Sequence, residues 1–169
     1  MDFALIYSLG VCALSIALEG IFAGGGIKKR LAELRVPRYV PPLWGWIVIG
    51  AFYYVICFVV LYRLFSMPAT VALRQWALVL LGGIMFINAL WNYFFFRTRN
   101  LFHAFVIGFP YSVLAVVLFG VLLNLDLTAA WSFLPYLLYL FYAAVFGYRV
   151  WKLNQPLAAE PGAAADGGA

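Results

Sequence analysis

The sequence predicts an all-α membrane protein built as a bundle of five transmembrane helices. Five apolar stretches, at about 3–26, 44–65, 72–96, 101–124 and 129–151, fill most of the 169-residue chain. A helix needs about 20 mostly apolar residues to cross the hydrocarbon of a bilayer, and each stretch meets that length. Hydrophobic residues make up 67% of the chain and charged residues 10%, against roughly half and a quarter in soluble domains. Strand-type alternation is absent, and helices satisfy their own backbone hydrogen bonds in lipid.

The first span and the loop after it set the organisation of the chain. The span starts without a basic region and is too long for a cleavable signal peptide, so we expect it to be retained. It ends at three glycines, and the polar loop 27–41 follows as the longest connection between spans. Pro41 and Pro42 suit the start of the second span, since proline is tolerated in a first helical turn. We expect one membrane domain over 1–153 and a disordered tail over 154–169.

The later spans are joined by short connections, which predicts antiparallel neighbouring helices. Asp126 or Thr128 could cap the fifth span. Pro110 interrupts the fourth span and predicts a kink there. Pro135 lies within about two turns of the start of the fifth span.

The basic residues are divided unevenly between the two sides of the membrane that the predicted spans define. If the chain crosses the membrane at each span, nine of the eleven Lys and Arg residues lie on one side, and Arg63 and Arg74 lie on the other. The positive-inside rule then predicts that the N-terminus is outside and the C-terminus is cytoplasmic. We therefore expect the net charge of +5 to meet anionic lipid headgroups and not nucleic acid.

A few polar residues within the spans are candidates for function, because polar groups in lipid are costly. Glu19 is the only acid within a span. It is either a proton or cation site, or an interfacial acid that pairs with Lys28 or Lys29 or reaches the lipid headgroups. Asn88, Trp91 and Asn92 share one helix face through their spacing of three and four residues. They form either interhelical hydrogen bonds or a pocket with a polar group beside an aromatic wall.

Other candidates favour structural roles. Cys12 and Cys57 lie inside spans and are expected to pack as thiols without a disulfide. The single histidine, His103, is not expected to form a metal site, and no catalytic triad, carboxylate pair or phosphate loop is present. Four small residues of the first span, spaced for close helix packing, indicate packing inside the bundle in preference to a dimer face: Ala13, Ala17, Gly20 and Gly24.

Five tryptophans near the ends of spans fit an interfacial belt: Trp44, Trp46, Trp76, Trp131 and Trp151. Aromatics on inward faces would suit a flat apolar ligand: Tyr53, Tyr54, Trp91, Tyr136 and Tyr139.

Three segments carry a resemblance to a known family: Val36-Pro37-Arg38-Tyr39-Val40-Pro41-Pro42-Leu43-Trp44, Asn88-Ala89-Leu90-Trp91 followed by Phe94-Phe95-Phe96, and Asp126 followed by Pro135-Tyr136-Leu137. In order and spacing they resemble the TspO/MBR family, which includes the translocator protein and the tryptophan-rich sensory proteins. The resemblance covers most of 1–154. It implies a five-helix membrane protein, commonly dimeric, that binds tetrapyrroles, and in some lineages sterols, beneath the first loop.

The resemblance also implies site residues. Trp44, Tyr54, Asn88 and Trp91 match positions that line or support the family pocket, and Tyr136 and Tyr139 add aromatic walls. The sequence departs from the family at several positions where family members often carry Pro, Trp or Asn; these positions are Ile47, Gly50, Tyr139 and Gly147 here. Gly50 in place of Trp enlarges the pocket or removes a stacking wall. A weak sterol pattern runs through Val145, Tyr148 and Lys152.

The leading hypothesis is a binding or sensory protein of a bacterial inner membrane, with no required cofactor. It would take a flat hydrophobic ligand, most simply a porphyrin or other tetrapyrrole, between the first, second, third and fifth spans under the loop 27–41. Sterols and other lipids are further candidate ligands. Two alternatives are a proton-coupled exporter that uses Glu19, and a porphyrin-degrading enzyme, which the loss of Trp at Gly50 disfavours.

Overall fold

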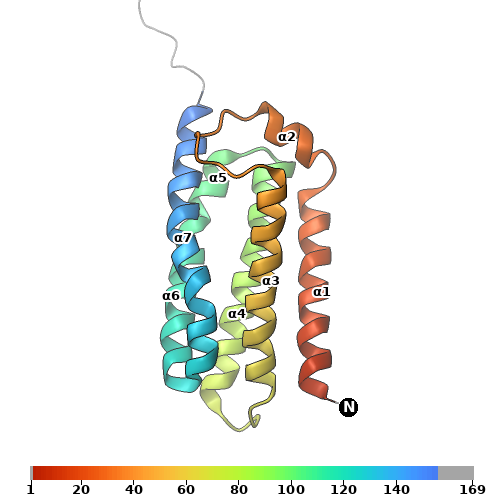
Figure 1. Ribbon diagram of the computed structural model, residues 1–169, viewed down its shortest axis with the longest axis vertical. Helices are drawn as coiled ribbons and strands as arrows, with labels where there is room; N and C mark the ends of the chain where they lie inside the picture. Colours follow the sequence, from red (N-terminus) through yellow and green to blue (C-terminus); the bar gives the residue numbers. More distant parts are fainter. Residues whose placement is uncertain (1, 156–169) are drawn as a thin grey trace, which may run out of the picture.

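The computed structural model describes residues 2–155, and this part of the chain is helical without a strand (Figure 1). Five spans are long and apolar enough to cross a membrane, as predicted. Their helices are α1 (Phe3–Ala23), α3 (Leu43–Phe65), α4 (Ala72–Asn92) continued by the π-helical turn η1 (Tyr93–Arg97), α5 (Leu101–Val106) followed by α6 (Gly108–Leu125), and α7 (Leu127–Leu153). The short helix α2 (Ile27–Glu33) follows α1. The predicted tail lies outside the described residues from 156 onward.

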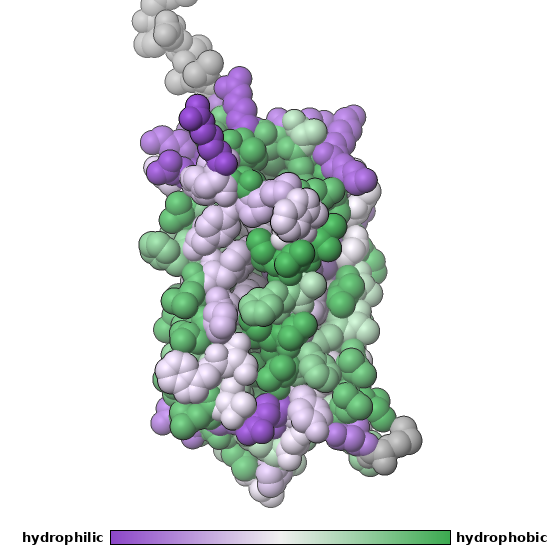
Figure 2. Space-filling model, viewed as in Figure 1, coloured by the Kyte–Doolittle hydropathy of each residue, from purple (hydrophilic) through white to green (hydrophobic). Residues whose placement is uncertain are grey.

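The long helices form a closed ring, in which α1 contacts α3, α3 contacts α7, α7 contacts α6, α6 contacts α4, and α4 contacts α1. The helix α2, the short helix α5 and the C-terminal end of α7 lie at one end of the ring, and the N-terminus lies at the other (Figure 1). Polar residues gather at both ends and a broad apolar band separates them (Figure 2). Such a surface suits a bilayer, because the exposed apolar side chains of the band would face lipid.

The first loop is more ordered than its composition indicates. The first helix ends at Ala23, because Gly24 and Gly26 adopt positive φ angles of 66° and 95°, which glycine tolerates best. The chain then turns into α2, a helix that the sequence did not predict. Gly45 allows Pro41 to fold back over the first turn of α3, since a Cβ at Gly45 would lie 2.8 Å from the Cβ of Pro41.

The fourth span is interrupted as predicted, but the break lies before the proline. The helix α5 ends at Val106, and α6 begins at Gly108. Pro110 has no N–H to donate to the carbonyl of Val106, four residues earlier, and its ring clashes with that carbonyl. Pro135 sits inside α7 without ending it.

The expectation that the small residues of α1 pack inside the bundle is wrong. Ala13, Ala17, Gly20 and Gly24 are all exposed, and a Cβ at Gly20 would meet no atom within 4 Å. The residues that α1 buries are on its other face and include Ser8 and Cys12. Cys12 and Cys57 are both free thiols.

The basic residues of the first loop are tied to the same end of the bundle. Arg30 donates to the carbonyls of Phe95 and Arg99, and Arg99 lies 3.2 Å from a carboxylate oxygen of Glu33. Burial and the neighbouring Arg99 lower the pKa of the Arg30 guanidinium. Asn154 holds the C-terminal end of α7 to the loop through the backbone N–H and carbonyl of Arg35. This end of the bundle therefore carries the basic excess.

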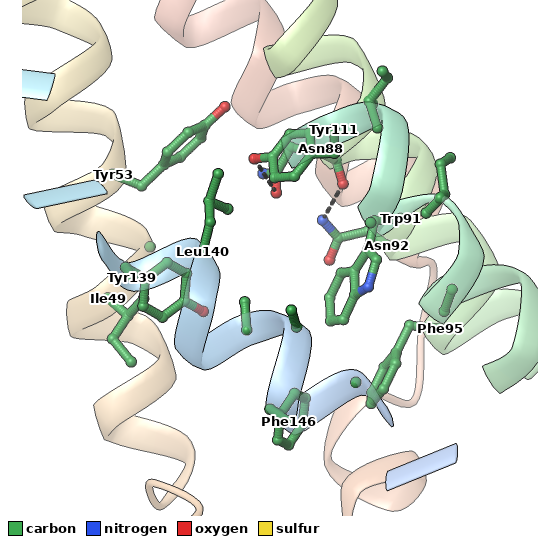
Figure 3. Close-up of a pocket in the computed structure, with 18 of the residues that line it drawn as sticks. Ile49, Tyr53, Asn88, Trp91, Asn92, Phe95, Tyr111, Tyr139, Leu140 and Phe146 are labelled. Atoms are coloured by element: carbon green, nitrogen blue, oxygen red, sulfur yellow. Dashed lines mark hydrogen bonds between the residues drawn. The ribbon is translucent and has the colours of Figure 1, made fainter. Parts of the chain in front are cut away.

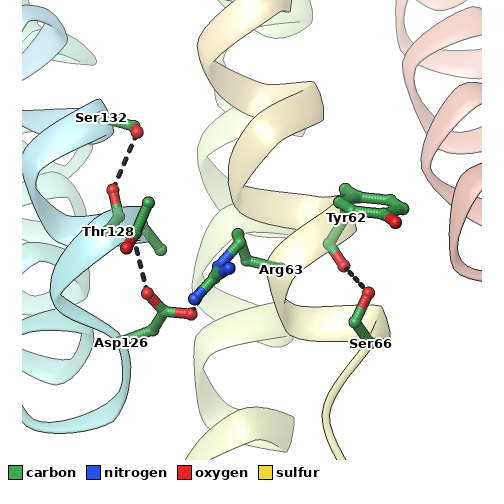
Figure 4. Close-up of polar contacts among 7 residues, drawn as sticks. Tyr62, Arg63, Ser66, Asp126, Thr128 and Ser132 are labelled. Atoms are coloured by element: carbon green, nitrogen blue, oxygen red, sulfur yellow. Dashed lines mark hydrogen bonds and ion pairs between the residues drawn. The ribbon is translucent and has the colours of Figure 1, made fainter.

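At the opposite end, Asp126 joins two spans (Figure 4). Its Oδ1 accepts the backbone N–H of Ala129 and caps α7, and its Oδ2 lies 2.7 Å from Nε of Arg63 on α3. Burial opposes ionisation, but the hydrogen bonds from Arg63 and Ala129 outweigh it and lower the pKa of the Asp126 carboxyl. The stabilisation that the ionised Asp126 gives the fold is therefore present at neutral pH, and it is lost as the pH falls through this lowered pKa.

The two roles of Asp126 can be separated by substitution. Asp126→Asn keeps a capping oxygen and loses the ion pair, so we expect it to cost less than about 1 kcal/mol. Asp126→Ala loses both contacts and should cost about 1 kcal/mol more. Thermal unfolding in detergent, with Arg63→Met as a second route to losing the pair, measures the difference. Equal losses for Asn and Ala would contradict the capping role.

Candidate functional site

A cavity of about 500 Å³ lies inside the ring of helices, in the half of the bundle next to α2. The other half is filled by the main core, whose fully buried side chains include Val60, Leu81, Leu118 and Phe133. A second, smaller cluster around Leu34, Phe95, Phe146 and Val150 closes the end under the first loop. The cavity lies between these two clusters. Its volume falls in the range of ligand sites, roughly 300–1,000 Å³.

Aromatic side chains form much of the cavity wall (Figure 3). Trp91 stacks on Phe95, with ring centroids 4.6 Å apart and planes 18° apart. Trp46 packs on Phe146 at 5.0 Å. The π-helical turn η1 shifts the register after α4, so that Phe95 and Phe96 face the cavity together with Trp91. Insertions of this kind are frequent at functional sites. The wall can therefore stack against a flat ligand.

Polar groups gather at the end of the cavity nearest the main core, which we call the floor: Glu19, Tyr53, Asn88, Tyr111 and Tyr136. Oε1 of Glu19 accepts two hydrogen bonds, from the Tyr54 hydroxyl at 2.6 Å and from Nδ2 of Asn88 at 2.5 Å. The Tyr111 hydroxyl donates to Oδ1 of Asn88 at 3.3 Å and is also paired with the Tyr136 hydroxyl. One network thus joins α1, α3, α4, α6 and α7.

Two polar atoms of the floor are left without a partner among the described residues. The Tyr53 hydroxyl is buried and forms no hydrogen bond, although only 6% of the residue is exposed. Oε2 of Glu19 accepts no hydrogen bond, and neither of the two ion pairs in the described chain involves Glu19. Glu19 therefore does not pair with Lys28 or Lys29, which is one form of the predicted interfacial role.

Most of the predicted site residues face this cavity. Glu19, Asn88, Trp91, Tyr136 and Tyr139 all line it. Their spans also bring Asn92 into the lining, and its side chain donates to the backbone carbonyl of Asn88.

Two predicted residues lie elsewhere. Trp44 is 68% exposed on the outer surface and does not line the cavity; Trp46, two residues later on α3, takes the inward position instead. Tyr54 lies behind Glu19 and acts on the cavity through its hydrogen bond to that carboxylate. The fourth span, which was not expected to border the pocket, contributes Phe105, Tyr111 and Ser112.

The sequence signals for the missed residues were ambiguous. The sequence predicts Trp46 in the interfacial belt, because position near the end of a span does not separate inward from outward tryptophans. Tyr111 follows Pro110 directly and lies close after the break between α5 and α6, so its helix face is hard to predict from the sequence. No motif of the sequence indicates either position.

Three of the four departures from the family, Gly50, Tyr139 and Gly147, line the cavity. Gly50 lines it, and a Cβ there would meet no atom within 4 Å. Gly147 lines it as well, where a Cβ would be in ordinary contact with Phe105 at 3.7 Å. Ile47 is 65% exposed and faces outward. Gly50 therefore leaves open space in the cavity, at the position where the resemblance leads us to expect a tryptophan.

The chemistry available here is hydrogen bonding, stacking and the charge of one carboxylate. The described residues contain no group of three or more His, Cys, Asp or Glu side chains that could hold a metal ion. His103 lies at the start of α5, where its ring stacks on Phe94, and it does not line the cavity.

Comparison with known proteins supports the resemblance drawn from the motifs. The model of the TspO/MBR family matches residues 8–152, which include nearly all of the five spans and every residue of the cavity lining. A search of curated proteins found no match. The family match and the five apolar helices together describe an integral, multi-pass membrane protein, and the chain belongs to the TspO/MBR family.

Proposed function

We propose that this chain is a membrane binding or sensory protein that takes a flat hydrophobic ligand into the cavity between its helices. The observation that carries the proposal is an aromatic-walled cavity of about 500 Å³ with polar groups gathered on its floor. Ligand sites are typically apolar and concave, with a few polar groups that fix orientation. A binding role, without catalysis, accounts for these features.

A porphyrin or other tetrapyrrole is the ligand class we favour. The stacked pair of Trp91 and Phe95 offers a flat surface for a macrocycle, and membership of the TspO/MBR family supports this class. Sterols and other lipids are the next candidates, because they share the apolar body but gain less from stacking.

The setting we propose is the inner membrane of a bacterium. The basic end of the bundle, which carries α2, would face the cytoplasm under the positive-inside rule. Its arginines and lysines would contact anionic headgroups.

Pairing of two copies through the exposed small residues of α1 is a further proposal, since Ala13, Ala17 and Gly20 permit close approach of helices. A monomeric mass in detergent at all protein concentrations would contradict pairing.

Substitution of Trp91 tests the proposed function. We expect Trp91→Ala to weaken binding of protoporphyrin IX at least about fivefold, because loss of a stacking ring and its buried area removes about 1 kcal/mol or more of binding free energy. The shift of the porphyrin absorbance band on titration measures the affinity. Trp76→Ala is the matched control, since Trp76 lies on the same helix, is 64% exposed and is outside the cavity. Equal affinities of parent and Trp91→Ala, or no saturable binding by the parent, would contradict the proposal.

A second candidate function is proton-coupled export, which the position of Glu19 on the cavity floor favours. An acid that faces a cavity within a membrane is a common element of proton relays. Efflux of a porphyrin from proteoliposomes under a proton gradient, in parent and Glu19→Gln, would decide it. Unchanged flux in Glu19→Gln would exclude this function.

A further inference from the structure

The lining of the cavity carries a charged side chain at one end and apolar side chains of α2 at the other. Glu19 on the floor is the only carboxylate among the lining residues. At the opposite end, α2 supplies Ile27 and Leu31 to the lining and carries Lys28, Lys29 and Arg30. Arg30 is bound to the carbonyl of Phe95, itself a lining residue. None of these three basic side chains lines the cavity, so the charged group that a ligand in the cavity meets among the lining residues is the Glu19 carboxylate.

We propose that the floor is a subsite for a nitrogen that donates hydrogen bonds and carries a positive charge, such as a protonated amine on an apolar, flat body. This inference rests on the proposed function and adds the polar group that the ligand presents. Glu19 would be the residue that determines this specificity.

The carboxylate of Glu19 can accept more hydrogen bonds than the described residues donate to it. An ionised carboxylate has about four acceptor positions, and the two donors that reach Glu19, Tyr54 and Asn88, both bind Oε1. No basic side chain of the described chain lies within ion-pair distance of it. A charge in apolar surroundings is costly unless it is paired. A cationic nitrogen would supply both the missing charge and the missing donors.

Tyr53 is the second, independent observation. Its buried hydroxyl has no partner among the described residues and belongs to the lining of the cavity. Its ring lies 5.0 Å from the ring of Tyr54, which holds Glu19, and 5.0 Å from the ring of Tyr136. Figure 3 shows the hydroxyl directed across the floor, toward the side where Asn88 and Tyr111 lie. An unsatisfied buried hydroxyl is costly, so a donor that reaches Glu19 and Tyr53 together removes two deficits.

The aromatic walls of the cavity also suit a positively charged nitrogen. Trp91, Tyr139 and Trp46 surround the space above the floor, and aromatic faces attract ammonium groups. A ligand carboxylate on the floor would instead face the Glu19 carboxylate, and the repulsion of two like charges in a low dielectric is severe.

The test uses three fluorescent probes with the same flat body: 1-pyrenemethylamine, 1-pyrenemethanol and 1-pyrenecarboxylate. They are titrated at neutral pH into the purified full chain in an uncharged detergent, with parent, Glu19→Gln and Glu33→Gln. Glu33→Gln is the matched control, because it removes the same charge from α2 without altering the cavity lining. Comparison of variants cancels the partition of each probe into micelles.

We expect the parent to bind the amine at least about tenfold more tightly than the alcohol, which corresponds to about 1.4 kcal/mol, and to bind the carboxylate most weakly. In Glu19→Gln the amine should lose this advantage while the alcohol binds as before, which also shows that the cavity is intact. Glu33→Gln should keep the order of the parent. Tyr53→Phe should weaken the amine several-fold and leave the carboxylate unchanged.

The outcomes separate the two proposals. If the alcohol binds saturably but the preference for the amine is absent or survives Glu19→Gln, the subsite is overturned and the proposed function stands. If the parent binds none of the probes and no protoporphyrin IX, the proposed function fails and this inference fails with it.

Discussion

Replacing Gly50 with tryptophan is expected to reduce binding of protoporphyrin IX at least about tenfold. The Cβ of the new side chain would point into open cavity, since nothing lies within 4 Å of it. The indole ring would occupy the space that the ligand needs, without disturbing the packing of α3. The titration that measures Trp91→Ala also measures this variant.

Gly120→Trp is the control for that prediction. Gly120 is exposed on α6, and a Cβ added there would also meet nothing within 4 Å, so the same substitution adds an indole ring outside the cavity. We expect this variant to bind as the parent does. Tighter binding by Gly50→Trp would mean that the tryptophan common in the family serves as a stacking wall, and that the glycine weakens the site instead of enlarging it.

Removing the amide of Asn88 should have the largest effect on stability. Asn88 donates to Glu19 on α1 and accepts from Tyr111 on α6, so Asn88→Ala breaks two contacts between helices. Such bonds are worth about 0.6–2 kcal/mol each within membranes. We expect the free energy of unfolding to fall by about 2 kcal/mol, because Glu19 also loses a hydrogen-bond donor. We expect the same variant to bind ligand more weakly.

Thermal unfolding in detergent, followed by circular dichroism, measures the effect of Asn88→Ala. Asn92→Ala is the matched control, because the Asn92 side chain bonds only to the backbone carbonyl of Asn88 in its own helix. It should cost clearly less. Equal losses for the two variants would mean that the network across the floor does not hold the helices together.

The fold was predictable because lipid imposes a simple rule on the chain. Runs of about 20 apolar residues set the five spans, and the motifs around Pro41, Asn88 and Pro135 suggested the family. Boundaries such as Ala23 and Ile107 were harder to predict, because they depend on a glycine with positive φ and on the steric demand of Pro110 just after the break. The helix α2 was missed because a polar loop and a short surface helix have similar compositions.

The site was predictable in part, and the errors share one cause. Asn88 and Trp91 could be assigned because an amide in a span needs a partner and its neighbours share its face. Trp44 and Trp46 could not be distinguished, because in a span surrounded by lipid both the inward and the outward faces are apolar. The same ambiguity led to the wrong placement of the small residues of α1. Hydrophobic periodicity separates core from surface in water, and it loses this power in a membrane.

The measurement that tests the central claim most directly is photo-crosslinking of a flat apolar probe, a pyrene that carries a diazirine, followed by mapping of the labelled residues by mass spectrometry. The account predicts adducts on cavity residues such as Trp46, Trp91 and Tyr139, and their loss when protoporphyrin IX is added in excess. Labelling confined to the outer surface, at residues such as Trp76 and Phe141, and unaffected by the porphyrin, would contradict it.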